Sequence, residues 1–507
     1  MSTRYLAYLI DAIVGLVMLP FNLHHLGMAA YGLWMLTSSV TAYLTMLDLG
    51  YGGALVRFVA RYRAQRDAKA LNEVLSTLSV VYTAIAIITY LIVLVIASNL
   101  EWLTRVSPEN AATSRTLLLV VGANIALRFV FGIYGGVVVG FQRYHLNNLT
   151  SIGTSLAVAA ANVLVLTVGH GDVVALVAVT TAVRVAALLV YKFNASRVFP
   201  GLSISWALFS RERLREVTGF SVFMLGLDAA YKVNYSSDVM VIGALLGTPA
   251  VALWSPAQRL SEVTLKLSNQ LAEALFPIVV DCDAGQRDAR LRRIFIEGTK
   301  LSLATVLPIA GGLAMLADPL LVAWIGPSFS TTATIVQLLA GVVIVRVGSS
   351  TASVLLKGAG LHRRLTALVA LMAVANIVLS IALAGPLGLA GVAIGTLIPV
   401  TLVAALGYFP TACRRVQISF TELFRRAFWP PLWPAFVVAG LLFVTRSRMP
   451  ATLPSVGLQF AAGGITYIVL FLLAVGGESR REYLRHADGL LKRRPRRMSH
   501  VGTVNAS

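Results

Sequence analysis

The chain has 507 residues, of which 57% are hydrophobic and 13% are charged, and its mean hydropathy is +0.79. Soluble domains carry about 25% charged residues, so this composition excludes a soluble globule and a single-span receptor with a large outer domain. The net charge is +20. In a chain with many membrane spans, such an excess reflects cytoplasmic loops before it reflects nucleic acid, and we expect no nucleic-acid partner.

Apolar runs of about 20 residues, the length with which a helix crosses a bilayer, recur along the whole chain. The first half contains them near 5–23, 31–50, 74–97, 116–139, 149–168, 173–191 and 217–243. The second half contains them near 248–276, 299–317, 331–356, 364–384, 389–409, 428–445 and 455–475. The predicted fold class is an all-α polytopic membrane protein with about fourteen transmembrane helices.

The distribution of Lys and Arg predicts which side of the membrane each loop faces. With the N-terminus inside, 32 of the 42 basic residues fall in cytoplasmic segments, four in outer loops and six within spans. Lys and Arg concentrate in cytoplasmic loops, so both termini are expected in the cytoplasm. The basic run at 492–497 is interpreted as part of the same topology signal.

The two halves of the chain share a sequence pattern at a shift of 220 positions. Leu26-Gly27, Trp34, Ala54-Leu55 and Gly140 return as Leu246-Gly247, Trp254, Ala274-Leu275 and Gly360. Six spans separate the copies, so the two lobes have the same orientation, with a substrate path between them. We therefore expect an N-terminal lobe at 1–200, a C-terminal lobe at 201–415, two extra spans at 416–477 and a basic cytoplasmic tail at 478–507.

Ionisable residues inside spans are costly and usually face a cavity or a partner. In the span near 248–276, polar residues recur at steps of three and four, which places them on one face of a helix. A phosphate needs several cations at once, and the candidate diphosphate-binding residues are Arg259, Lys266, Arg346, Arg128 and Lys232. The candidate cavity acids, as partners of these cations or as sites of proton or sodium coupling, are Asp11, Asp48, Asp228, Glu262 and Glu273.

Several of these charges have a purely structural alternative. Asp228 and Lys232 lie four residues apart and could pair only with each other. Asp48 could cap a helix or pair with Arg57. Arg184 lies close to the end of its span, and we interpret it as reaching the membrane interface rather than a cavity.

Motifs of catalysis are missing from the sequence. It has no Walker A loop, no His-Glu-x-x-His and no Gly-x-Ser-x-Gly. The two cysteines, Cys282 and Cys413, form no ligand pattern. We therefore expect a protein that is not an enzyme and that has no cofactor and no metal.

The first repeat carries a family pattern. Gly27, Gly32 and Trp34, followed by Asp48, Gly50 and Arg57, resemble the N-terminal region of polysaccharide-export (O-antigen-type) flippases, members of the multidrug/oligosaccharidyl-lipid/polysaccharide (MOP) exporter superfamily. The resemblance implies two six-span lobes plus two helices, with a cavity lined mainly by spans 1, 2, 7 and 8. It implies alternating-access transfer of undecaprenyl-diphosphate-linked oligosaccharide to the outer leaflet of a bacterial inner membrane. Lipid-linked oligosaccharide and membrane lipids are the implied partners, with polysaccharide polymerases and glycosyltransferases as further candidates.

Two other functions stay open at this point. A multidrug or metabolite antiporter of the same superfamily would be expected to have an acidic cavity for cationic drugs, whereas Arg and Lys here match or exceed the acids. A membrane glycosyltransferase or ligase would need catalytic acids or a sizeable outer domain, and the predicted outer loops are short. The flippase is the favoured interpretation.

Overall fold

The computed structural model describes residues 2–99, 108–169 and 171–475, and all regular elements within these ranges are helices. The first half contains α1 (Ser2–Leu44), η1 (Thr45–Asp48), α2 (Tyr51–Ala64), α3 (Ala68–Ser98), α5 (Pro108–Gly140), α6 (Tyr144–Thr167), α7 (Val173–Val198) and η2 (Trp206–Leu208). Next come α8 (Arg211–Leu245), α9 (Thr248–Ser268), α10 (Gln270–Ala284), α11 (Asp288–Met315), α12 (Ala317–Trp324), η3 (Pro327–Thr332), α13 (Ala333–Gly358) and α14 (His362–Val403). The last elements are η4 (Ala404–Tyr408), α15 (Phe409–Val416), α16 (Phe420–Leu423), η5 (Phe424–Phe428), α17 (Trp429–Arg446) and α18 (Leu453–Ala474). The predicted all-α class is confirmed.

Helix α1 contains two membrane-length segments joined at Gly27. Its 43 residues would extend about 64 Å as one helix, roughly twice the hydrocarbon thickness of a bilayer. At Gly27 the backbone leaves the helical region with φ 75°, a conformation that favours glycine. Gly247, between α8 and α9, has φ 87°. The two glycines paired by the sequence repeat therefore play the same backbone role.

The end of α5 corrects one pairing of that repeat. A Cβ atom added to Gly140 would fall 2.4 Å from Val59 Cγ1, and one added to Gly358 would fall 2.4 Å from Val279 Cγ1. Gly358, the last residue of α13, is thus the counterpart of Gly140, two residues before the Gly360 that the sequence shift indicates. Gly360 lies in the following turn with φ 73°.

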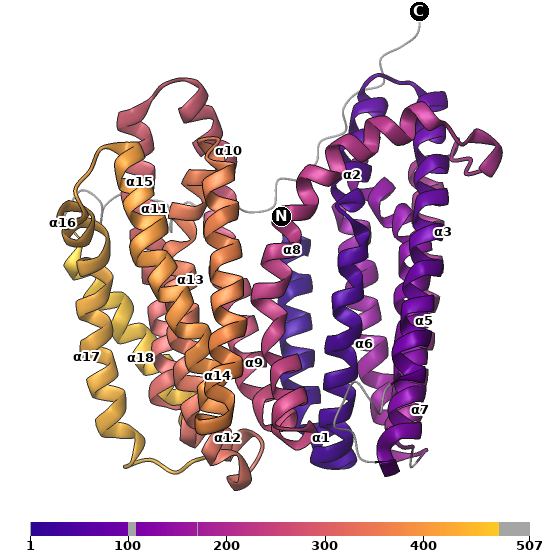
Figure 1. Cartoon of the computed structure of the whole chain (residues 1–507). Coiled ribbons are helices and arrows are strands. Elements are labelled where there is room, and N and C mark those ends of the chain that lie inside the picture. Colours follow the sequence, from indigo (N-terminus) through magenta and orange to yellow (C-terminus); the bar gives the residue numbers. More distant parts are fainter. Residues whose placement is uncertain (1, 100–107, 170, 476–507) are drawn as a thin grey trace, which may run out of the picture.

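Ten of the described helices are long and apolar enough to cross a membrane. Two of them, Thr3–Asp48 and Arg363–Val416, run over the backbone breaks at Gly27 and Gly388, and each is long enough for two passes. Helices α8 to α10 are outside this set of ten, although Figure 1 shows α8 and α9 running beside the others. The number of fourteen spans stays a prediction.

The helices form two groups that meet at one end (Figure 1). In Figure 1, α1 to α7 lie on one side and α10 to α18 on the other, with α8 and α9 between them. At the end where they meet, a Cβ atom on Gly32 of α1 would fall 2.0 Å from the carbonyl oxygen of Thr248 in α9. A Cβ atom on Gly243 of α8 would fall 2.3 Å from the side chain of Leu36. The two glycines therefore permit close contact between the halves.

At the opposite end, the segment between α7 and α8 is fixed to the first half by hydrogen bonds. Asn72 Nδ2 donates to the Gly201 carbonyl at 2.8 Å, and the Ser210 N–H donates to Thr77 Oγ1 at 3.1 Å. Val217, in the first turns of α8, is fully buried in the core formed by α2, α3 and α5. Residues 199–217 therefore pack as part of the first half.

A charged cluster strengthens this attachment. Arg213 forms ion pairs at 3.3 Å with both Glu73 and Glu216, and its Nη1 donates to the Tyr62 hydroxyl at 2.8 Å. Tyr62 in turn donates to Glu216 at 3.1 Å, and Glu216 also pairs with Arg61 at 2.7 Å. Burial, followed by the hydrogen bond to Glu216, raises the pKa of the Tyr62 hydroxyl above its ordinary value.

The carboxylate of Asp48 acts as a local structural clamp. Its Oδ2 accepts a hydrogen bond from the Gly52 N–H at 2.9 Å, and its Oδ1 accepts one from the Tyr82 hydroxyl at 2.9 Å. These bonds cap the start of α2 and attach it to α3. Of the alternatives raised by the sequence, the structure therefore supports capping, and Asp48 is not among the described residues that line the large cavity.

We expect Asp48→Ala to lower the thermal stability of the purified full-length protein. Two partly buried donors lose their acceptor, which costs about 1–3 kcal/mol of unfolding free energy. Tryptophan fluorescence during heating in detergent measures the effect. Asp281→Ala is the matched control, because Asp281 is exposed and its side chain has no contact among those described. Equal Tm values for the two variants would contradict the clamp.

Candidate functional site

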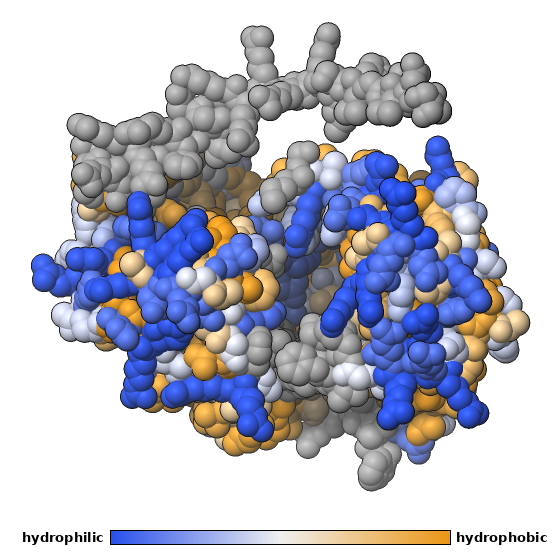
Figure 2. All heavy atoms as spheres, turned by 90° about the horizontal axis from the view of Figure 1, so that it is seen from above, coloured by the Kyte–Doolittle hydropathy of each residue, from blue (hydrophilic) through white to orange (hydrophobic). Residues whose placement is uncertain are grey.

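A cavity of about 1040 Å³ lies in the membrane-spanning part of the protein and is lined by residues from α1, α5, α6, α7 and α9. Figure 2 shows the molecule from the end at which the two halves diverge, with the surface hollowed between two groups of hydrophilic residues. Four of the five lining helices belong to the first half of the chain, and α9 completes the wall from the second half.

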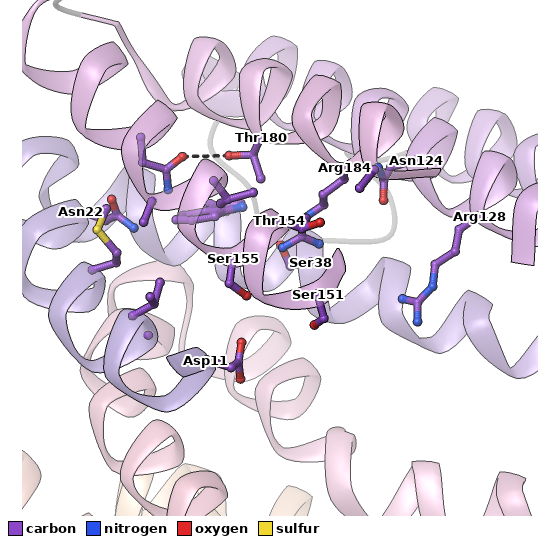
Figure 3. A pocket seen from close by; sticks show the side chains of 18 of the residues that line it. Asp11, Asn22, Ser38, Asn124, Arg128, Ser151, Thr154, Ser155, Thr180 and Arg184 are labelled. Atoms are coloured by element: carbon purple, nitrogen blue, oxygen red, sulfur yellow. Dashed lines mark hydrogen bonds between the residues drawn. The ribbon is translucent and has the colours of Figure 1, made fainter. Parts of the chain in front are cut away.

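The cavity carries an excess of positive charge. Among the described residues that line it are four cations, Arg128 of α5, Arg184 of α7, and Arg259 and Lys266 of α9, and two carboxylates, Asp11 of α1 and Glu262 of α9. Figure 3 shows Asp11, Arg128 and Arg184 around the same space, although they come from three different helices. This charge balance favours an anionic ligand.

Arg259 crosses from α9 to α1. Its Nη2 donates to the Asp11 carbonyl at 2.7 Å and lies 3.6 Å from the Asp11 carboxylate. Its guanidinium group lies against Gly15, where an added Cβ atom would fall 1.8 Å from Nη2. The side chain is 20% exposed, and its Nε has no hydrogen-bond partner among the described residues. Arg259 thus connects the two halves at the wall of the cavity.

Hydroxyl and amide groups line the rest of the wall. On α6 they follow one helical face, with Asn147, Ser151, Thr154 and Ser155 at steps of four, three and one. Buried oxygens of Asn22, Asn147 and Gln258 have no hydrogen-bond partner within the described part of the protein. Since buried polar atoms are normally satisfied, these oxygens mark positions near the cavity where the described part of the protein supplies no donor.

The structure brings together most of the candidate residues whose side chains it describes. Arg128, Arg259 and Lys266 line one cavity with Asp11 and Glu262. Lys266 Nζ lies 3.9 Å from the Asp11 carboxylate, and Arg259 Nη1 lies 3.8 Å from Glu262. The side chains of Asp228, Lys232 and Glu273 lie outside the described set.

Arg346 is not among the described residues that line this cavity. It lines an adjoining pocket of about 70 Å³ together with Asp238 and Thr396, and this pocket shares Gln258 and Glu262 with the large cavity. Thr396 Oγ1 donates to Asp238 Oδ1 at 3.1 Å and accepts from Asn376 Nδ2 at 2.7 Å. The first half contains a similar Asn–Thr contact, in which Thr180 Oγ1 donates to Asn162 Oδ1 at 2.9 Å. The sequence singled out Arg346 but not Asp238, which no polar stripe marks.

Arg184 corrects the sequence interpretation. Its side chain lines the cavity near Arg128 rather than reaching the interface. Its position near the end of a span favoured the interface, but Thr180, Arg184, Ala187, Leu188 and Tyr191 form one face of α7 that turns to the cavity. The same spacing on α6 was also missed, because Ser and Thr are common in membrane helices.

Comparisons with known protein sequences place this chain in a family. The family model described as "Polysaccharide biosynthesis protein" matches residues 2–282, which is more than half of the chain. A Haloferax volcanii protein named "Probable flippase AglR" is 24% identical over 95% of this chain and 97% of its own. The "Uncharacterized membrane protein EpsK" of Bacillus subtilis is 24% identical over 85% of this chain and 86% of its own.

Solved structures share the fold. A structure titled "Lipid II flippase MurJ, inward closed conformation" superposes with a TM-score of 0.70, covering 96% of this chain and 98% of that chain at 13% identity. An inward-facing multidrug resistance transporter of the MATE family, from the MOP superfamily, superposes with a TM-score of 0.62, covering 80% of this chain and 98% of its own at 17% identity. From the family match and this shared architecture, the chain belongs to the polysaccharide biosynthesis protein family and has the fold of the MOP superfamily.

Proposed function

We propose that this protein flips an undecaprenyl-diphosphate-linked oligosaccharide from the cytoplasmic to the outer leaflet of a bacterial inner membrane, for polysaccharide synthesis. The observation that carries the proposal is the large cavity with four cations and two carboxylates inside a MOP-superfamily fold. The names of a relative that matches almost its full length, a probable flippase, and of a structural neighbour, a lipid II flippase, support the same proposal.

In this proposal, the cations of the cavity bind the diphosphate. A diphosphate offers several anionic oxygens, and arginine binds such oxygens through two parallel hydrogen bonds. Arg128, Arg184, Arg259 and Lys266 supply these donors, while Asp11 and Glu262 partner the α9 cations when no ligand is bound. Lys232 of α8 remains a candidate for binding the diphosphate. Arg346 is not assigned to the diphosphate, because it lines the small pocket with Asp238 rather than the large cavity.

The wall of α6 and α7 would contact the sugars. Drug-sized ligands occupy pockets of about 300–1,000 Å³, so a cavity of about 1040 Å³ has room for a head group larger than one diphosphate. Hydroxyl and amide side chains form hydrogen bonds with sugar hydroxyls without adding charge. The prenyl chain would stay in the bilayer.

The direction of transfer follows from charge. Moving a negative charge outward across an inside-negative membrane releases about 2.3 kcal/mol per 100 mV. A diphosphate with about two negative charges would therefore be driven outward by the potential itself. A multidrug antiporter finds less support, because cationic drugs would be repelled by the same four residues.

Reconstituted protein tests the proposal. Vesicles containing the protein and a fluorescent undecaprenyl-diphosphate oligosaccharide are expected to expose the label to an added glycosidase with time, faster with an outward-driving potential. Protein-free vesicles provide the background. Exposure at the background rate, with correctly folded protein, would overturn the flippase assignment.

A further inference from the structure

A second basic pocket lies at the end of the first half, outside the large cavity. It has a volume of about 520 Å³ and is lined by Arg63 of α2, by Arg143 at the α5–α6 turn, by His145 at the start of α6, and by Asn194 and Arg197 of α7. None of its lining residues also lines the large cavity. The two pockets are therefore separate features.

The arginines of this pocket lack counter-ions in the part of the chain that the structure describes. No carboxylate is among the described lining residues, and Arg63, Arg143 and Arg197 form none of the ion pairs described. Other arginines near helix ends are paired, for example Arg213 of α8 with Glu73 and Arg415 of α15 with Asp288. Three guanidinium groups around one pocket, with no counter-ion among the described residues, call for an anion with several acceptor oxygens, such as a phosphate.

Aromatic stacking holds one wall of the pocket in place. The guanidinium group of Arg63 lies over the Phe141 ring at 5.8 Å, and Phe141 stacks on Phe199 with ring centroids 5.6 Å apart. Phe141 and Phe199 pack against the core of the first half. One wall of the site is thus held in place before any ligand arrives.

The rim of the pocket continues into exposed apolar stripes. On α7, Leu189, Phe193 and Arg197 follow one another at steps of four. The side chains of Leu189 and Phe193 are 58% and 60% exposed. On α6, His145 precedes Leu149 by four residues, and Leu149 and Leu156 are also exposed. In a protein embedded in a membrane, such apolar faces contact lipid chains. The pocket therefore lies where a head group would sit above its own acyl chains.

We propose that this pocket binds the phosphate of an anionic phospholipid from the adjacent leaflet. Arg143 and Arg197 bind the phosphate oxygens, and Arg63 adds a third cation from the wall that contains Phe141. The acyl chains lie along the exposed apolar stripes at Leu149 and at Leu189–Phe193. Continuity with these stripes favours a lipid over a soluble phosphate. Basic pockets between helix ends are a known way for membrane proteins to select anionic lipids.

Binding of phosphatidylglycerol to the full-length purified protein tests the proposal. Lipid adducts are counted by native mass spectrometry as phosphatidylglycerol is titrated into detergent, with phosphatidylcholine as the neutral comparison. The double variant Arg143→Gln/Arg197→Gln is expected to bind phosphatidylglycerol about tenfold more weakly, because each cation contributes to anionic-lipid attraction. The variant Arg143→Lys/Arg197→Lys, which keeps the charge, should retain part of the binding.

A matched double variant controls for net charge. Arg66→Gln/Arg290→Gln removes two exposed cations outside the pocket and should bind like the parent protein. Equal loss in both glutamine variants, or equal binding of phosphatidylcholine, would overturn the proposal. Displacement of phosphatidylglycerol by millimolar inorganic phosphate would assign the pocket to a soluble anion. Displacement by undecaprenyl diphosphate would assign it to the transported lipid. Either result would overturn the phospholipid site.

Discussion

Replacing Arg259 with glutamine is expected to slow the flipping of a lipid-linked oligosaccharide by about thirtyfold. Arg259 is 20% exposed and lines the large cavity, where its guanidinium group lies beside α1. Losing a charge-assisted hydrogen bond to the diphosphate costs about 2 kcal/mol, which corresponds to about thirtyfold in binding. The vesicle assay with fluorescent oligosaccharide measures this loss at subsaturating substrate.

A variant at Gly15 separates the position of Arg259 from its charge. An alanine at residue 15 would place Cβ 1.8 Å from the guanidinium Nη2, so the guanidinium must move although every charge is retained. Gly15→Ala is therefore expected to reduce flipping in the same direction as Arg259→Gln. Arg290→Gln, which removes an exposed cation away from the cavity, should leave flipping unchanged. Parental flipping in both Gly15→Ala and Arg259→Gln would remove Arg259 from the proposed site.

Gly32→Ala is expected to force apart the backbone contact between the two halves. Its Cβ atom would fall 2.0 Å from the Thr248 carbonyl oxygen and 2.8 Å from the Thr248 carbonyl carbon. Since both atoms belong to backbone, no side-chain rotation relieves the overlap, and α1 must move away from α9. Overpacking of this kind costs about 1–3 kcal/mol. We expect a lower Tm and faster thiol labelling of Asn22→Cys, which lies close to this end of the cavity.

Gly440→Ala provides the matched control for this experiment. Gly440 also lies within a helix, but a Cβ atom there meets nothing within 4 Å. The added methyl group should leave labelling unchanged and should raise stability slightly, because alanine restricts the unfolded chain. If Gly32→Ala and Gly440→Ala behave alike in both measurements, the halves are not held together by the close approach at Gly32.

Features that depend on one helix were predictable from the sequence. The polar stripe of α9 follows from steps of three and four, and the structure places Arg259, Glu262 and Lys266 on one cavity wall. The matching breaks at Gly27 and Gly247 follow from the repeat, because a backbone turn that needs positive φ is restricted to few residue types.

Features that depend on the neighbouring helix were not predictable. Spacing places Arg346 on a face of α13, but it does not say that this face lies against Asp238 and Thr396 in a small pocket beside the large cavity. Arg184 was misplaced for a related reason, since depth along a span does not say which side of the helix meets water. The α6 wall contains small hydroxyl residues. Burial or exposure of such residues costs little free energy, so their spacing does not predict which face of the helix lines the cavity.

The attachment of residues 199–217 to the first half has a consequence for synthesis. As the chain emerges, α1 to α7 are complete by Val198, yet Asn72, Glu73 and Thr77 still lack the partners that arrive with Gly201, Arg213 and Ser210. The hydrophobic core of this half also waits for Val217. The first half can therefore complete its packing only after the ribosome has made the opening turns of α8. Residues at the beginning of the second half thus complete the core of the first half.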